Sequence, residues 1–246
     1  AGGLVGENDG GGSIANAYAT GSVTSTGDAG GLVGWSGGYL DTDSGSITNA
    51  YATGNVTSKS LSGWINVGGL VGYNWATGTI TNAYATGNVQ GSGDPVTTIG
   101  GLVGHNEGGS ITNAYASGTA TGLSSYAEVG GLVGWNDYDG HITNAYATGA
   151  VTGSKSNAYT GGLVGMNGGN VTNTYATGAI TATGKNTGGL AGYNDGDITA
   201  SFWDMTRTGK TTAIGSNDGG TVNATSLTTA QLQDTAGFMA RAGSWD

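Results

Sequence analysis

Short apolar segments alternate with glycine and polar residues along the chain. One recurring segment reads Gly-Gly-Leu-Val-Gly, and a second reads Ile-Thr-Asn-Ala-Tyr-Ala-Thr-Gly in its fullest form. A third, shorter segment follows the second, as in Asn55-Val56-Thr57. These segments are too short, too β-branched and too often interrupted by glycine to form helices. The pattern therefore predicts three short strands, separated by turns, in each repeating unit.

The first segment recurs often enough to define a period. Its leucine stands at seven positions, and the last copy has Ala191 in place of valine: Leu4, Leu32, Leu70, Leu102, Leu132, Leu163 and Leu190. Successive leucines are 27 to 38 residues apart. Such a period is typical of a solenoid, because a single coil cannot bury its apolar face and a stack of coils can. We therefore predict an all-β fold, a parallel β-helix of about seven three-stranded coils over residues 1–201.

Equal positions of successive coils are expected to lie above one another, which turns the second segment into two columns. Asparagine amides can hydrogen-bond along such a stack, and tyrosine rings can stack on one another. The asparagine column contains Asn16, Asn49, Asn82, Asn113, Asn144 and Asn173, and the tyrosine column contains Tyr18, Tyr51, Tyr84, Tyr115, Tyr146 and Tyr175. Because side chains alternate along a strand, Ile, Asn and Tyr share one face, and we expect that face to point inward.

A second asparagine row lies two residues after Gly-Gly-Leu-Val-Gly. It contains Asn8, Asn74, Asn106, Asn136, Asn167 and Asn194, with Ser36 in the second repeat. Asparagine tolerates a left-handed backbone, so we expect this row to turn a corner of the coil.

The two longer segments together resemble the GLUG-motif repeats of large bacterial surface proteins, including filamentous-haemagglutinin-like adhesins and immunoglobulin-A-cleaving metallopeptidases. The resemblance covers residues 1 to about 201 and implies a secreted, non-catalytic stalk or adhesive module. Ser201-Phe202-Trp203-Asp204 and the segment 227–232 also resemble the closing part of such arrays. The peptidase members keep their zinc site elsewhere, and no His-Glu-x-x-His occurs in this chain, so that activity is not transferred.

The two ends of the chain differ from the repeats. Residues 202–246 break the pattern and are predicted to cap the solenoid, with a helix in Thr228–Ala242 that is capped by Thr228 or Thr229. The chain starts inside a predicted strand at Ala1-Gly2-Gly3-Leu4. Two interpretations stay open: a piece of a longer protein, or subunits that stack head to tail into a fibre.

Composition excludes several classes of protein. Among 246 residues there are 53 Gly, one Pro and no Cys, which excludes collagen and a disulfide-stabilised scaffold. The net charge of -10, with only 6 Lys and Arg, argues against nucleic acid as a partner. No apolar run of about 18 residues occurs, so membrane insertion is not expected.

An aromatic row directly after Gly-Gly-Leu-Val-Gly is the first candidate contact surface. It contains Trp35, Tyr73, His105, Trp135 and Tyr193. An exposed row would pack on sugar rings or on a protein partner, whereas a half-buried row would be ordinary stacking. Glu7 at the same position of the first repeat favours exposure.

Variable connections form the second candidate surface. The longer versions are Lys59–Val67, Gln90–Ile99, Gly122–Val129 and Gly153–Thr160, and they contain Trp64, Pro95, Tyr126 and Tyr159. Insertions on one edge often mark the binding side of a solenoid. The alternative is a drift in loop length without function.

Other chemistry is sparse. His105 and His141 occupy variable positions and are read as surface residues, so no catalytic residue and no metal ligand is predicted. The turn Asp41-Thr42-Asp43-Ser44-Gly45 resembles the opening of a calcium loop but lacks the closing Glu, which leaves calcium as a weak alternative to no cofactor. Only Lys59, Lys155 and Lys185 are cationic in residues 1–201, and no acid–base cluster stands out.

We therefore predict a non-enzymatic structural or adhesive module of an extracellular or cell-surface bacterial protein. Its expected partners are copies of itself, end to end, and a host or matrix glycan or protein. A glycan-binding solenoid is the main alternative. An ice-binding solenoid is a further one, because threonine recurs at Thr48, Thr81, Thr112, Thr143 and Thr172, although the unequal repeats weaken it. A polysaccharide-degrading enzyme is less favoured.

Overall fold

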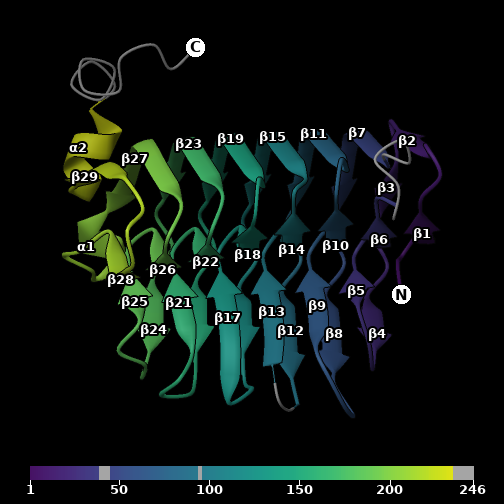
Figure 1. Ribbon diagram of the computed structural model, residues 1–246, viewed down its shortest axis with the longest axis horizontal. Helices are drawn as coiled ribbons and strands as arrows, with labels where there is room; N and C mark the ends of the chain where they lie inside the picture. The colour runs from purple at the N-terminus through teal and green to yellow at the C-terminus, as the bar shows by residue number, and fades with distance from the viewer. Residues whose placement is uncertain (39–44, 94–95, 235–246) are drawn as a thin grey trace.

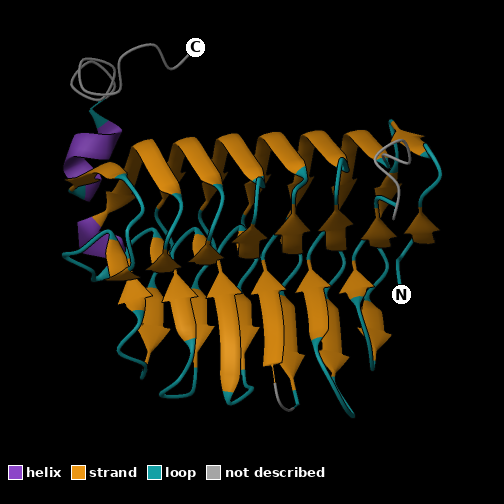
Figure 2. Cartoon of the chain, viewed as in Figure 1, coloured by secondary structure: helices purple, strands orange, loops and turns teal. Residues whose placement is uncertain are grey.

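The computed structural model describes residues 1–38, 45–93 and 96–234. The chain winds into a parallel β-solenoid of about six turns, because the two shorter of its four parallel sheets have six strands each (Figure 1). Strands dominate, and both described helices lie near one end (Figure 2). We name the sheets A to D. In Figure 1, sheet C lies along the top, sheet B through the middle, and sheets A and D at the bottom.

Each complete turn contributes to all four sheets, and sheets B and C extend beyond sheets A and D. Sheet A contains β5 (Ala29–Gly30), β9 (Ile65–Gly68), β13 (Val96–Gly100), β17 (Tyr126–Gly130), β21 (Tyr159–Gly161) and β25 (Thr187–Gly188). Sheet B contains β1 (Val5–Asn8), β6 (Val33–Ser36), β10 (Val71–Trp75), β14 (Val103–Glu107), β18 (Val133–Asp137), β22 (Val164–Asn167), β26 (Ala191–Asn194) and β28 (Ile214–Asn217). Sheet C contains β2 (Ser13–Ala15), β3 (Tyr18–Ala19), β7 (Ser46–Ala52), β11 (Thr79–Ala85), β15 (Ser110–Ala116), β19 (His141–Ala147), β23 (Asn170–Ala176), β27 (Asp197–Asp204) and β29 (Val222–Leu227). Sheet D contains β4 (Val23–Ser25), β8 (Val56–Lys59), β12 (Val89–Ser92), β16 (Ala120–Gly122), β20 (Val151–Gly153) and β24 (Ile180–Ala182).

The coils have four strands, so the prediction of three-stranded coils was wrong. The Gly-Gly-Leu-Val-Gly segment is a corner rather than one strand: Gly68 ends β9 and Val71 begins β10. The corner is tight enough to require glycine, because a Cβ at Gly68 would lie 1.9 Å from the Val71 carbonyl oxygen. A seventh complete coil stays a prediction.

Equivalent residues of neighbouring coils pair in register. Tyr51 pairs with Tyr84, and Tyr84 pairs with Tyr115, across three adjacent strands of sheet C. Successive coils therefore stack like on like, as the repeats predicted.

Two apolar cores run along the solenoid and are separated by a row of glycines. The leucines of the first segment, with Ile and Ala of sheet C, fill the core between sheets B and C. Residues such as Val56 and Val67 fill the second core, between sheets D and A. Between the cores the backbones of sheets A and B pass closely, because a Cβ at Gly104 would lie only 2.5 Å from the Val67 nitrogen. We call this line of contact the glycine waist.

The second segment bends at its asparagine, which corrects the predicted inward face. Asn49 has φ of 52°, in the left-handed region, and the equivalent asparagines have φ of 52° or 53°. This residue shifts the alternation of side chains by one position. In β7, Ile47 and Ala50 are therefore buried, whereas Asn49 is exposed and Tyr51 is half-buried.

The other asparagine row was also assigned the wrong conformation. Asn74, Asn106 and Asn136 have no positive φ; they lie within strands of sheet B and are completely buried. The left-handed conformation therefore occurs in the row that contains Asn49, and the burial occurs in the row that contains Asn74.

Residues after 201 continue two of the sheets before the chain turns helical. Strands β28 and β29 add to sheets B and C. Helix α1 (Met205–Thr208) was not expected, and helix α2 (Thr229–Gln233) begins after Thr228, which forms a capping box with Gln231. The rest of the predicted helix, residues 235–242, lies outside the described residues, and the capping role stays a prediction.

Candidate functional site

Two ladders of side chains run along the outside of sheet C. Asn82 donates to the Asn49 side-chain oxygen at 3.1 Å, and Asn113 donates to Asn82 at 3.2 Å. The same contact links Asn49 to Asn16, Asn144 to Asn113 and Asn173 to Asn144. Next to this ladder, the rings from Tyr18 to Tyr175 stack with centroids 4.7 to 5.2 Å apart. These columns bind one coil to the next.

A second amide ladder, buried beside the first core, was missed by the sequence analysis. Asn74 donates to Asn106 at 2.7 Å, and Asn106 donates to Asn136 at 2.8 Å. The chain of amides continues through Asn167 and Asn194 to Asn217. Each amide also donates to a nearby carbonyl, such as that of Gly109. The regular spacing of this row was visible in the sequence, but its burial was not.

The predicted aromatic row forms a stack on the outer side of sheet B. The rings of Tyr73 and His105 are 4.9 Å apart, and those of His105 and Trp135 are 4.6 Å apart. Trp35 stacks on Tyr73 at 5.8 Å. Met166 then separates the stack from Tyr193. The rings are buried or half-buried, which favours stacking over an exposed stripe.

His105 was predicted at the surface, and this was wrong. Only 7% of the residue is exposed, because strand β9 of sheet A packs against β14 at the glycine waist. Burial lowers the pKa of His105 to about 4, so the imidazole is neutral near pH 7. His141, in contrast, is exposed at the start of β19.

Sheet A faces the aromatic stack with a row of polar residues. Asp28 accepts hydrogen bonds from the backbone and side chain of Asn66, and Thr98 donates to Asn66. Glu128 in the same row is buried, and its Oε2 has no hydrogen-bond partner among the described residues. Desolvation and the nearby charge of Asp137 raise the pKa of Glu128 to about 8.

Trp64 belongs to the variable connection Lys59–Val67 and lies beside the aromatic stack. The residue is 59% exposed, and its ring centroid is 6.0 Å from that of Trp135. The fold therefore joins one loop aromatic to the aromatic stack. Sequence spacing could not show this contact, because Trp64 and Trp135 belong to different coils.

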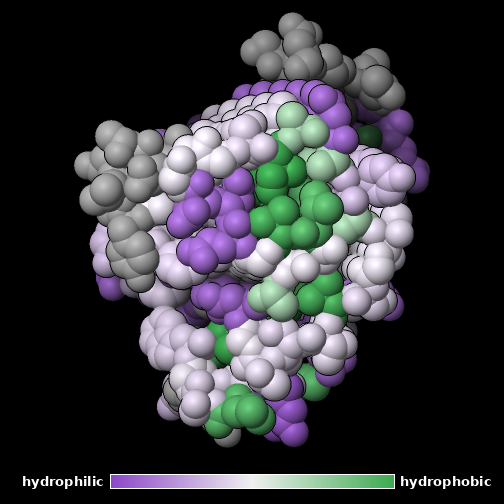
Figure 3. Space-filling model, turned by 90° about the vertical axis from the view of Figure 1, so that its right-hand side faces the viewer, coloured by the Kyte–Doolittle hydropathy of each residue, from purple (hydrophilic) through white to green (hydrophobic). Residues whose placement is uncertain are grey.

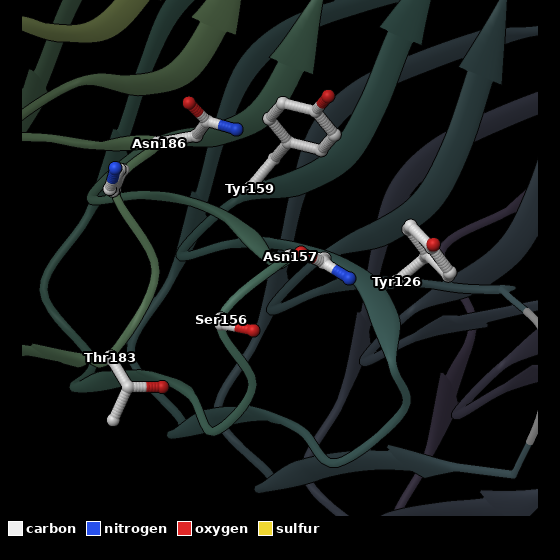
Figure 4. A pocket seen from close by; sticks show the side chains of 7 residues that line it. Tyr126, Ser156, Asn157, Tyr159, Thr183 and Asn186 are labelled. Carbon is white, nitrogen blue, oxygen red and sulfur yellow. The ribbon is translucent and has the colours of Figure 1, made fainter.

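Tyr126 and Tyr159 instead meet at a pocket of about 490 Å³ at the loop edge of sheets A and D (Figure 4). The variable connections join sheet D to sheet A and lie along this edge, at the bottom of Figure 1. The pocket is lined by Tyr126, Ser156, Asn157, Tyr159, Thr183, Lys185 and Asn186. We call it the loop pocket. It gathers two of the eight predicted contact residues. Five others lie on or beside the aromatic stack, and Tyr193 packs on Tyr159.

The Gly-Gly-Leu-Val-Gly corner and the strand that carries the exposed asparagines and tyrosines belong to a known sequence repeat. The family model described as the GLUG motif matches residues 1–24, 25–57, 65–90, 96–121 and 125–152, which is more than half of the chain. The chain belongs to the GLUG-motif family. No curated protein and no solved structure matches this chain.

The remaining predicted features of this GLUG-motif protein are the calcium-like turn, Pro95 and the threonine row. Asp41–Ser44 of the calcium-like turn, and Pro95, lie outside the described residues. Within the described ranges, no three His, Asp or Glu side chains gather as metal ligands. None of the described helices is long and apolar enough to cross a bilayer. The threonine row is half-buried on sheet C.

Proposed function

We propose that this chain serves as a non-catalytic adhesive rod of a secreted or cell-surface bacterial protein. Its GLUG repeats and β-solenoid form a structural repeat module. The observation that carries the proposal is the continuity of the ladders. Backbone pairing, the exposed amide ladder from Asn16 to Asn173 and the tyrosine stack each connect successive coils of sheet C without a break. Such a rod is stiff along its axis and can hold a contact surface away from a cell.

The chemistry of the site supports a role without catalysis. His105 and Glu128 are buried, and their shifted pKa values keep both neutral at neutral pH. A general acid or base has to reach a substrate proton. The described side chains bond mainly within their own columns, which supports a structural role.

Surface labelling of the producing bacterium tests the location. Antibodies against the intact chain should label cells before permeabilisation, and external protease should remove that label. Labelling that requires permeabilisation would contradict the proposal.

End-to-end association is the second part of the proposal. The end of the solenoid that carries β1 and β2 shows an apolar patch (Figure 3). Leu4 is 53% exposed there, and Val5 and Ile14 are only partly buried against the first core. A second copy that stacks on this end would cover the patch and continue the sheets.

Electron microscopy of the purified chain tests this contact. Filaments are expected at high concentration, and Leu4→Asp should abolish them while the circular dichroism spectrum stays unchanged. Leu61→Asp, at an exposed leucine away from this end, is the control and should still form filaments. Monodisperse particles at high concentration would overturn end-to-end stacking.

A further inference from the structure

The loop pocket has the construction of a small-molecule site. Its volume of about 490 Å³ lies within the range of roughly 300–1,000 Å³ that is typical of ligand pockets. Strands β17 and β21 supply Tyr126 and Tyr159, and the loops before β21 and β25 supply the polar groups (Figure 4). Two tyrosines and several hydroxyl and amide groups therefore line one volume.

The polar side chains of the pocket are free to bind a ligand. Asn157 and Asn186 offer amides, and Ser156 and Thr183 offer hydroxyls. Within the described part of the chain, none of these four side chains forms a hydrogen bond to another protein group. Sugars present hydroxyls at their edges and C–H groups on their faces, so they suit this combination of amides and aromatic rings.

The loops that form the pocket are held in place by hydrogen bonds to their own backbone carbonyls. The Ala158 amide donates to the Lys155 carbonyl at 3.2 Å, and the Thr187 hydroxyl donates to the Gly184 carbonyl at 2.9 Å. Tyr159 packs edge-on against Tyr193, with ring centroids 5.8 Å apart. The loop backbone and the Tyr159 ring are therefore already ordered, which lowers the entropy cost of binding a ligand.

Two lysines lie in or beside the pocket of this acidic chain. The net charge is -10, yet no Asp or Glu occurs between Asp139 and Asp195. The same stretch contains Lys155 and Lys185, and neither forms an ion pair with a described residue. Lys185 lines the pocket, and Lys155 precedes the lining residue Ser156.

Carboxyl groups also lie near the pocket: Asp218 accepts a hydrogen bond from Tyr193, which packs on Tyr159, and Glu128 is buried in the strand next to Tyr159. Glu128 pairs in register with Tyr159 across β17 and β21. Desolvation raises the pKa of Glu128 to about 8, so the group is mostly uncharged at pH 7. The cationic Lys185 in the pocket lining favours an anionic group of a ligand at this place.

We propose that the loop pocket binds an acidic oligosaccharide, with the sugar carboxylate paired to Lys185 and an apolar ring face against Tyr126 or Tyr159. This inference rests on the proposed adhesive function, since it names the class of ligand that one contact site of the adhesive rod would bind.

Calorimetry on the intact chain tests the inference. The acidic probes are trigalacturonate, a hyaluronan tetrasaccharide and sialyllactose, and the neutral controls are galactotriose and chitotriose. At least one acidic probe should bind at least tenfold more tightly than either neutral sugar. Because the pairing is electrostatic, this preference should shrink at high salt.

Two exposed pocket residues provide the variants. Tyr126→Ala should weaken binding of the acidic probe at least tenfold, and Lys185→Gln should remove the preference for acidic over neutral sugars. Lys59→Gln removes the same charge at β8, outside the pocket lining, and should leave binding unchanged.

Three outcomes would overturn the inference: no binding of any acidic probe, equal binding of the neutral sugars, or equal losses in Lys59→Gln and Lys185→Gln. Failure of the adhesive function is seen separately, by surface labelling. A labelled rod without sugar binding contradicts only the pocket, and sugar binding by an intracellular protein contradicts only the adhesive function.

Discussion

Asparagine performs two different tasks in this solenoid, and the backbone decides which. The left-handed conformation of Asn82 turns its amide to the surface, whereas Asn106, in a regular strand, places its amide in the interior. Both form ladders, because a primary amide has a donor and an acceptor that can point in opposite directions along the axis. The buried ladder is the more sensitive of the two, since an unpaired polar atom costs more away from water.

The substitution of serine in the second repeat leaves a gap in the buried ladder. Ser36 stands where the other coils have asparagine, and the buried Asn74 Oδ1 has no partner among the described residues. We expect Ser36→Asn to donate to this oxygen and raise the free energy of unfolding by about 1 kcal/mol. Chemical denaturation would measure it.

The reverse substitution provides the control. Asn136→Ser creates the same gap in the middle of the ladder and should lower the free energy of unfolding by about 1–3 kcal/mol. If Ser36→Asn is no more stable than the natural chain, the ladder does not contribute in this way.

Glu128 gives the stability a specific pH dependence. Burial raises its pKa from 4.5 to about 8, so between these values the folded chain keeps a proton that the unfolded chain releases. The contribution of Glu128 to stability is therefore fully present below about pH 4.5, falls as the pH rises, and levels off above about pH 8.

Glu128→Gln should remove this dependence. The variant should gain stability relative to the natural chain from pH 5 to 8, by at most about 1.4 kcal/mol per pH unit. Denaturation at several pH values measures the difference. Glu7→Gln, at an exposed position of sheet B, should show no such trend. A constant difference for Glu128→Gln would disprove the raised pKa.

At the scale of the elements, glycine determines how the sheets meet. The first glycine of Gly-Gly-Leu-Val-Gly permits the corner between sheets A and B, and the last permits their close approach at the glycine waist. The two cores can share one narrow coil only because no side chain stands between these backbones. Larger residues at the waist would have to push two sheets apart, and both cores with them.

Substitution at the waist should therefore depend on position. A Cβ at Gly134 would lie 2.5 Å from the Ile99 nitrogen, whereas nothing lies within 4 Å of a Cβ at Gly6, the equivalent position of the first repeat. We expect Gly134→Ala to cost about 3 kcal/mol or more, because backbone cannot move aside as a side chain can. Gly6→Ala should change stability little. Thermal or chemical unfolding would compare the stabilities of the two variants. Equal losses would contradict the close approach of sheets A and B at the glycine waist.

At the scale of the whole molecule, the solenoid behaves as a stack in one dimension. Each coil contacts mainly the coils before and after it, so stability should grow with the number of coils. Because Gly100 pairs in register with Gly130, removing residues 101–130 joins two equivalent corners. Tyr84 would then stack on Tyr146.

We expect this shortened chain to fold, with a lower free energy of unfolding and a smaller denaturant dependence in proportion to its length. Circular dichroism and denaturation would measure both. Removing residues 101–115 takes out about half a coil, breaks the register and should prevent folding. Equal behaviour of the two deletions would argue against in-register stacking.

The sequence by itself determined the strands, their period and the columns of like residues, because these follow from spacing along the chain. Only the tertiary structure decided which side of a strand faces inward, since one left-handed asparagine reverses the alternation that spacing implies. It also decided that sheet A covers His105, that Trp64 meets Trp135, and that Tyr126 and Tyr159 share a pocket with Lys185. Those contacts join different coils or different sheets, and their geometry depends on the close approach of two backbones at the glycine waist, which no pattern along a single chain specifies.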